Sequence, residues 1–303
     1  MKSALVAWGE RYFYAPSPFQ KFLSFLLKPF ELLYCSAAYL RFRTLRAKVP
    51  PIPVVSVGNL TVGGSGKTPL TVALAADVPD AAIVLRGYGR RSKGVQVISE
   101  RGEIGCDVAC SGDEAMEYAL LLPQATVIVA EVREAGIEKA AELGCRCVFL
   151  DDGYGKHGIE KFDIVIDVDT PNRFCLPAGP YRERLWKGKR ARVVKEGRDF
   201  VRSVRIDNPE TTMALVTAIA RPQRLDRFLP PVVSKHYFAD HHFFRREELE
   251  EILRTSGADA LLVTYKDYVK IRRFDLPTAV LRLHLEVDEA LRSEVNDYIR
   301  NPI

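Results

Sequence analysis

Residues 61–68 combine small, flexible residues with a Lys-Thr pair, which is what a loop needs in order to bind a phosphate group. Glycines let the backbone curl until its N–H groups face the phosphate. Lys67 can reach the β- and γ-phosphates of a nucleotide, and the hydroxyl of Thr68 can bind Mg²⁺. The loop departs from the pattern G-x-x-x-x-G-K-[ST], because Thr61 stands at the first glycine position. The predicted nucleotide-binding residues of the loop are Thr61, Val62, Gly63, Gly64, Ser65, Gly66, Lys67 and Thr68.

A pair of carboxylates, Asp151 and Asp152, follows the short apolar run 147–150. A phosphate loop needs a carboxylate at the end of a neighbouring strand to hold Mg²⁺. In an open α/β sheet, the carboxyl ends of the strands border the crevice in which ligands bind. We therefore predict that Thr68, Asp151 and Asp152 form a magnesium site. The alternative is an aspartate pair that begins a loop and caps the next element.

The elements that must position these residues alternate between strand and helix. The β-branched run 54–57 is typical of a buried parallel strand, and the apolar run 69–76 predicts a helix with Pro69 in its first turn. Further strands are predicted at 82–85, 126–130, 164–168, 213–217 and 260–264, with helices at 113–122 and 134–143. This alternation predicts an α/β fold, with a P-loop NTPase-like, mostly parallel sheet and helices on both faces.

The composition fits a globular protein with two domains, or with one large domain and a small one. The chain has 303 residues, of which 47% are hydrophobic, so a sizeable core can be buried. The formal net charge is +5, and no long basic run indicates a nucleic-acid partner. Six cysteines in a chain of this length are typical of buried thiols in a reducing compartment. Residues 177–192 are rich in Gly, Arg and Lys, which favours a hinge or linker there.

Residues 19–45 are rich in large apolar side chains and are flanked by Lys and Arg. The longest uncharged stretch, 32–40, is under half of the about 20 residues that a membrane-spanning helix needs. Large apolar side chains next to Lys and Arg are typical of a helix that lies on an anionic membrane surface. An ordinary helix or helix pair that packs on the core explains this composition equally well. Three prolines within residues 50–53 then end the helical pattern.

Seven motifs, taken in order along the chain, resemble those of the tetraacyldisaccharide 4′-kinases of lipid A synthesis. The phosphate loop resembles the loop of that family, including its start without glycine, and the N-terminal apolar segment also fits the family. Several motifs in the same order are far more specific than any one of them. The matching residues are 57–69, 85–90, 112–114, 151–154, 176–183, 238–242 and 264–267.

The resemblance implies a P-loop domain joined to a smaller C-terminal α/β domain. We place an N-terminal helical segment at 1–48, the kinase core at 49–180 and the smaller domain at 181–303, with a hinge near 176–192. Part of the chain end is expected to return to the core. The implied reaction transfers the γ-phosphoryl group of ATP, with Mg²⁺, to the 4′-hydroxyl of a tetraacyldisaccharide 1-phosphate, a lipid A precursor. Such an enzyme is a peripheral protein on the cytoplasmic face of the inner membrane of a Gram-negative bacterium, and we expect a monomer.

The same resemblance implies roles for single residues. Asp113 is the general base, His241 is its partner from the second domain, and Lys67 neutralises phosphate charge. Arg86 and Glu183 belong to the nucleotide side. A histidine that is hydrogen-bonded to a carboxylate orients it and adjusts its basicity, so the pairing is chemically reasonable.

Taken from the residues alone, other interpretations stay open. Asp113 fits an N-cap of the helix that follows it. His241 and its neighbour His242 fit a metal pair or a polar turn. Arg86 fits a solvated loop, and Glu183 fits a surface charge among basic residues.

Two places depart from the motifs of the family. Where the family carries Asp-Asp-Gly-Phe-Gln-His, this chain has Lys156 at the sixth place and His157 one residue later. Tyr265 replaces the glutamate of a Thr-Glu-Lys-Asp motif. The main competing prediction is a P-loop ATPase or nucleotide switch that acts on a protein partner at the membrane. A nucleotide sensor without turnover and another small-molecule kinase are further alternatives.

Overall fold

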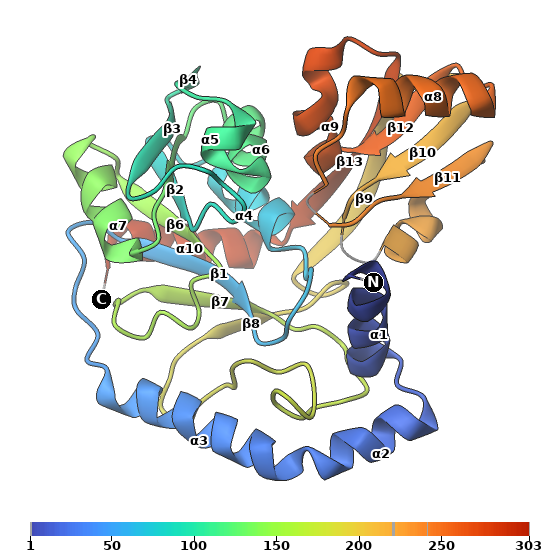
Figure 1. Ribbon diagram of the computed structural model, residues 1–303. Helices are drawn as coiled ribbons and strands as arrows, with labels where there is room; N and C mark the ends of the chain where they lie inside the picture. Colours follow the sequence, from blue (N-terminus) through green and yellow to red (C-terminus); the bar gives the residue numbers. More distant parts are fainter. Residues whose placement is uncertain (1, 220–221, 241, 303) are drawn as a thin grey trace.

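The structure is a computed structural model that describes residues 2–219, 222–240 and 242–302. Within these ranges the chain forms two sheets that lie side by side, and the N-terminal helices run along one side of the molecule (Figure 1). The strand order of the first sheet is β4-β3-β5-β2-β6-β1-β7-β8. Its strands are β1 (Val54–Asn59), β2 (Ala81–Leu85), β3 (Gln96–Glu100), β4 (Glu103–Ile104), β5 (Thr126–Val129), β6 (Cys147–Asp151), β7 (Phe162–Ile166) and β8 (Arg192–Val194).

The first sheet is parallel from β5 to β8, and β3 and β4 add an antiparallel edge. Successive residues of a strand point to opposite faces. Val55 and Val57 of β1 pack in a cluster with residues of α4, α6 and α10, whereas Val54 packs in a cluster with residues of α7. Helices therefore cover both faces of this sheet. They are α4 (Lys67–Ala75), α5 (Val108–Ser111), α6 (Asp113–Leu121), α7 (Arg133–Glu142) and α10 (Glu289–Arg300).

The second sheet has the strand order β11-β10-β12-β13-β9. Its strands from β11 to β13 are parallel, and β9 pairs antiparallel with β13. Its elements are β9 (Phe200–Asp207), β10 (Met213–Thr217), η1 (Pro222–Phe228), β11 (Ser234–Tyr237), α8 (Arg246–Ser256), β12 (Ala260–Thr264), α9 (Tyr265–Ile271), η2 (Arg272–Phe274) and β13 (Thr278–Val287).

The antiparallel pair of β9 and β13, called the ribbon below, connects the cores of the two sheets. Phe200 and Leu285 at one end of the ribbon are buried in the core of the first sheet. Ile206 and Leu281 at the other end belong to the core of the second sheet. After the ribbon, α10 packs back on the first sheet, where it contacts β1 (Figure 1).

The N-terminal helices are α1 (Lys2–Tyr14), α2 (Pro18–Leu26) and α3 (Lys28–Thr44). Ser17 and Gln20 form a capping box at the start of α2. These helices contact the loop at 172–184: the hydroxyl of Tyr34, for example, donates to the carbonyl oxygen of Arg182 over 3.0 Å. None of the helices in the described ranges combines the length and the apolar character needed to span a bilayer. Large apolar side chains of α2 and α3 are exposed, namely Phe19, Phe22, Phe25, Leu26, Phe30, Leu32, Leu33, Tyr39 and Leu40.

Candidate active site

The phosphate loop connects the end of β1 to the start of α4, as the sequence predicts. Gly66 is the N-cap residue of α4 and has a φ of 88°, a left-handed conformation that favours glycine. Lys67 begins the helix, and its Nζ atom lies 3.4 Å from Oδ1 of Asn59 and 3.7 Å from Oδ1 of Asp152. The ammonium group is thus held at the carboxyl end of β1, beside a helix N-terminus that favours bound anions.

The first residues of the loop are fixed by the 172–184 loop rather than by glycine. Thr61 is buried and forms a backbone bridge with Tyr181. The N–H group of Val62 donates to the carbonyl oxygen of Pro180 over 2.9 Å, and the hydroxyl of Tyr14 donates to the carbonyl oxygen of Val62. A residue in such a bridge needs no glycine, which explains how threonine can stand at the first position of the pattern.

The two carboxylates after β6 lie in different environments. Asp151 is buried, and its Oδ1 atom has no hydrogen-bond partner among the described residues. Burial, followed by repulsion from Glu114, raises the pKa of Asp151 to about 7. Burial also opposes the charge on Asp152, but Lys67 and Arg182 outweigh it, so the pKa of Asp152 is lowered.

This pair fits a hard divalent cation. Mg²⁺ is usually bound through one or two carboxylates together with phosphate oxygens. The buried oxygen of Asp151 without a partner is free to act as a ligand, and a nearby cation would favour its charged form. Thr68 lies in the first turn of α4, which packs on β6, the strand that ends in Asp151. The predicted magnesium site at Thr68, Asp151 and Asp152 stays a prediction.

Asp113 is the first residue of α6 and is buried. Its Oδ1 atom accepts a hydrogen bond of 3.0 Å from the N–H group of Glu114. The N-cap residue of this helix is Gly112, so the interpretation of Asp113 as the N-cap is wrong.

Helix α9 of the second sheet brings two lysines to this aspartate. Nζ of Lys266 lies 3.8 Å from Asp113, 3.8 Å from Glu114 and 3.6 Å from Asp240, and Nζ of Lys270 lies 3.9 Å from Asp113. Burial opposes the charge on Lys266, but the carboxylates outweigh it and raise its pKa to about 12. Lys266 belongs to the matching motif 264–267, but sequence reasoning paired neither lysine with Asp113, although their spacing of four residues places them on one face of a helix.

The predicted partner of Asp113, His241, lies outside the described residues. Its neighbour His242 is engaged elsewhere: its Nε2 atom lies 3.0 Å from Oε2 of Glu248, and its ring stacks on Phe238 at 4.8 Å. The pairing of Asp113 with His241 stays a prediction.

Glu183 lies where the 172–184 loop meets α3. Its carboxylate forms an ion pair with Arg41, accepts a hydrogen bond of 3.2 Å from Nε1 of Trp186 and lies 3.4 Å from Nε2 of His157. Burial opposes its charge, but His157 and Arg41 outweigh it, so the pKa of Glu183 is lowered. Because Glu183 is buried, its interpretation as a surface charge is wrong. Its backbone N–H group donates to the carbonyl oxygen of Leu60, directly before the phosphate loop.

The basic residues after β2 divide into two kinds. Arg90 stabilises the loop that follows β2, since its guanidinium group lies 2.5 Å from Glu131 and donates to the carbonyl oxygen of Gly94 over 2.6 Å. Arg86 is exposed at the end of β2 and lies near Lys156. Burial, followed by repulsion from Arg133 and then Arg86, lowers the pKa of Lys156. Lys156 therefore belongs to the basic group beside the carboxyl ends of the strands.

The two departures from the family motifs have structural explanations. His157 is engaged by other residues, since its buried ring contacts Lys189 at 3.0 Å as well as Glu183. Tyr265 is buried at the start of α9 in the core of the second sheet, and the guanidinium group of Arg282 lies 4.5 Å from the centre of its ring. A tyrosine at this position fills apolar space and places its ring against a guanidinium group.

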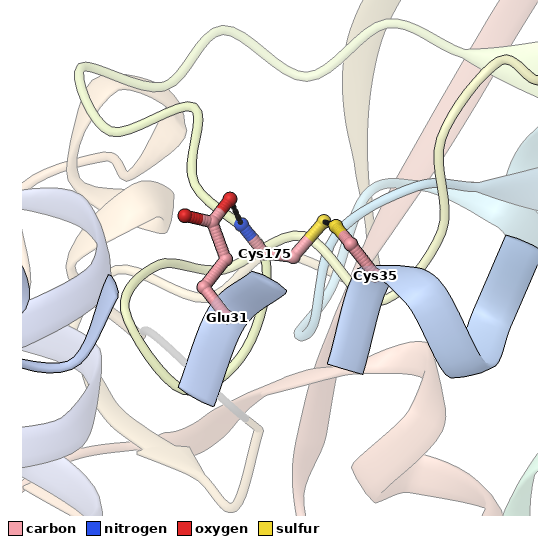
Figure 2. A group of neighbouring side chains, drawn as sticks. All are labelled: Glu31, Cys35 and Cys175. Carbon is pink, nitrogen blue, oxygen red and sulfur yellow. Dashed lines mark hydrogen bonds between the residues drawn. The ribbon is translucent and has the colours of Figure 1, made fainter. Parts of the chain in front are cut away.

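Among the described residues, metal-ligating side chains also gather at Glu31, Cys35 and Cys175 (Figure 2). The two sulfur atoms lie 2.7 Å apart, and Glu31 accepts the N–H group of Cys175 over 2.9 Å. Arg184 already supplies a cation here: it donates to Sγ of Cys175 over 3.2 Å and to Glu31 over 3.1 Å. The group therefore joins α3 to the 172–184 loop.

Comparisons with known proteins agree with this arrangement. Residues 23–201 and 195–300 match the family model described as tetraacyldisaccharide-1-P 4′-kinase. A tetraacyldisaccharide 4′-kinase of Aliarcobacter butzleri is 43% identical over 99% of this chain and 99% of its own length. One from Helicobacter pylori (strain ATCC 700392 / 26695) is 46% identical over 96% of this chain and 94% of its own length.

A solved structure extends the comparison to three dimensions. The crystal structure of LpxK from Aquifex aeolicus in complex with ATP aligns with a TM-score of 0.72 at 26% identity. The alignment covers 91% of this chain and 99% of the other. On sequence and on fold, the chain belongs to the tetraacyldisaccharide 4′-kinase family.

Proposed function

We propose that this protein transfers the γ-phosphoryl group of ATP to the 4′-hydroxyl of a tetraacyldisaccharide 1-phosphate, a step of lipid A biosynthesis. Membership of the family supports the reaction and the acceptor. The observation that carries the proposal is the phosphate loop, with Lys67 held between Asn59 and Asp152 next to the buried Asp151. This arrangement presents a positive charge and two carboxylates at one end of a parallel sheet.

Phosphoryl transfer depends mainly on positioning and on neutralising charge. In the proposed mechanism, the N–H groups of the loop and the ammonium group of Lys67 bind the β- and γ-phosphates. Thr68, Asp151 and Asp152 hold Mg²⁺, which supplies further positive charge at the phosphate oxygens when it is bound. We also propose Arg86 and the segment around Glu183 as the remaining contacts on the nucleotide side.

The acceptor hydroxyl must lose its proton as the new bond forms. We propose Asp113 as the base, with His241 as its partner. Asp113 lies at the start of α6, which packs against α9 of the second sheet, and we propose that the acceptor binds between the two sheets. Lys266 balances the negative charge of Asp113 and Glu114.

The acyl chains of the acceptor lie in a bilayer, and α2 and α3 suit such a surface. Phe22, Phe25 and Leu33 are each more than half exposed, and Lys21 and Lys28 lie beside them. Exposed apolar groups next to cations are typical of a helix at an anionic membrane surface. We propose that the protein binds the cytoplasmic face of the inner membrane of a Gram-negative bacterium through these helices, and acts as a monomer.

A transfer assay tests the proposal. Purified protein is incubated with γ-labelled ATP, Mg²⁺ and a detergent-dispersed tetraacyldisaccharide 1-phosphate. Label at the 4′ position of the distal sugar is the expected result, and the Lys67→Ala variant is the matched control without label. Steady release of phosphate with no label in the lipid would instead favour an ATPase that acts on another partner.

A further inference from the structure

Two arginines from the second half of the chain contact the phosphate loop. Arg202 lies on β9, and its Nη2 atom donates to the carbonyl oxygen of Ser65 over 3.0 Å. Arg224 lies in η1, and its Nη1 atom donates to the carbonyl oxygen of Gly64 over 2.7 Å. Two consecutive carbonyl groups of one loop are thus bound by cations from two different elements.

Peptide geometry gives these contacts a consequence on the other side of the loop. A trans peptide unit is planar, and its C=O and N–H bonds point in opposite directions. The carbonyl group of Ser65 shares its peptide unit with the N–H group of Gly66, and that of Gly64 with the N–H group of Ser65. Guanidinium groups that hold these carbonyls therefore keep the two N–H groups turned away from the arginines, as donors to a phosphate. Each bond also polarises its peptide unit, which strengthens the N–H group as a donor.

The guanidinium group of Arg202 is closely packed. It lies directly against Gly66, where an added Cβ atom would come within 2.5 Å of Nη2. The side chain is 16% exposed, its Nε atom lies 3.5 Å from Glu196, and its guanidinium carbon lies 5.6 Å from the centre of the Phe200 ring. Since Phe200 belongs to the core of the first sheet, Arg202 is anchored at the base of the ribbon. Arg224, by contrast, belongs to the second sheet beyond the ribbon.

We propose that Arg202 and Arg224 clamp the phosphate loop in the shape that receives the triphosphate of ATP, and thereby set the affinity for the nucleotide. The inference rests on the proposed function for the identity of the anion. Both arginines are positioning residues that act through the loop backbone. Arg224 lies on the far side of the ribbon, so it contacts the loop only when the second sheet lies against the loop. The affinity for the nucleotide therefore depends on the placement of that sheet.

The test compares Arg202→Met and Arg224→Met with a matched control, Arg205→Met, in the full-length protein. Arg205 lies on the same strand as Arg202, but its side chain is 77% exposed and faces Asp207 at 3.4 Å. The affinity for Mg-ATP is measured by calorimetry without lipid, and kcat and KM are measured with the lipid acceptor. We expect each clamp variant to raise both Kd and KM for ATP about tenfold, as for the loss of one charged hydrogen bond, and to leave kcat within about threefold. Arg202→Lys should recover part of the loss, and Arg205→Met should behave as the unchanged protein.

Three results would overturn the inference. The first is a Kd for ATP within about twofold of the unchanged protein in both clamp variants. The second is an equal loss in Arg205→Met, which would assign the effect to net charge. The third is a fall in melting temperature and kcat with an unchanged Kd, which would assign the arginines to structural support alone. Because binding is measured without lipid, failure to label the acceptor refutes the proposed function and leaves this test valid.

Discussion

Arg182 donates hydrogen bonds from both terminal nitrogen atoms to the two carboxylate oxygens of Asp152. Its Nη2 atom also donates to Oδ1 of Asn59 over 2.9 Å, and Asn59 in turn contacts Lys67. The 172–184 loop is thereby connected to the ends of β1 and β6. We expect Arg182→Ala to weaken the binding of Mg-ATP by about tenfold or more, because Asp152, a proposed magnesium ligand, loses the guanidinium group that positions it. Arg173→Ala on the same loop is the control, since Arg173 is exposed; equal Mg²⁺ titrations for the two variants would contradict the expectation.

Lys67→Ala should lower kcat by a factor of about 10² to 10³ or more, because the charge on the β- and γ-phosphates is no longer balanced. Lys67→Arg keeps the charge but replaces the compact ammonium group with a larger, planar guanidinium group, and should recover little. Initial rates at saturating ATP measure both variants. Turnover near that of the unchanged protein would remove the assignment of residues 61–68 as a phosphate loop.

Asp113→Ala should lower kcat by a factor of about 10² to 10⁴, the range for the loss of a general base. Asp113→Asn keeps the shape and should lose nearly as much, while the Kd for ATP stays close to its original value. Rates and nucleotide binding are measured on the same preparation. If affinity alone changes, Asp113 is a binding residue and the base lies elsewhere.

Asp151 should make the metal-free protein less stable as the pH rises. Its pKa is about 7 in the folded protein and 3.8 ordinarily, so the folded state holds a proton that the unfolded chain has released. The contribution of this group to the free energy of unfolding is greatest at a pH below its ordinary pKa. It is lost as the pH rises through the pKa that the group has in the folded protein. Asp151→Asn removes this titrating group. Between about pH 5 and pH 8, the free energy of unfolding of the variant should therefore rise, relative to that of the unchanged protein, by on the order of 1–3 kcal/mol.

Thermal unfolding without Mg²⁺ measures this difference. A gap between the two proteins that stays constant over that pH range would contradict the raised pKa. Added Mg²⁺ supplies a second check: it should stabilise the unchanged protein most at the alkaline end, and Asp151→Asn hardly at all.

The N-terminal helices should bind anionic vesicles through their exposed aromatic and aliphatic side chains. Replacing Phe22, Phe25 and Leu33 with serine should weaken vesicle binding by at least about tenfold, since less apolar surface is removed from water. Phe243→Ser is the control, because Phe243 is comparably exposed, at 58%, but lies far along the chain. Co-sedimentation with phosphatidylglycerol vesicles measures the effect, and equal binding of the triple variant and the control would exclude α2 and α3 as the contact surface.

The buried strands could be predicted from the sequence because continuous apolar runs are typical of parallel strands. The runs at 82–85, 126–130 and 164–168 are confirmed as β2, β5 and β7, although the last begins two residues earlier. The helices predicted at 113–122 and 134–143 are confirmed as α6 and α7. The ribbon was missed because β9 has no continuous apolar run: Arg202, Ser203 and Arg205 interrupt its apolar residues.

Local motifs could predict the phosphate loop and the two carboxylates, because strand, loop and helix follow one another directly. The sequence could not predict which distant residues meet. Arg202 is 137 residues from Ser65, and Arg41 is 142 residues from Glu183. Neither contact is marked by periodicity or spacing, because both depend on how the sheets and the N-terminal helices pack.

The ribbon also determines the mechanics of the molecule. The chain crosses from the first sheet to the second through β9 and returns through β13, and α10 then packs on the first sheet. A second sheet that is attached through two hydrogen-bonded strands has less freedom of position than one on a single flexible linker. The ribbon therefore helps to hold η1, with Arg224, beside the phosphate loop.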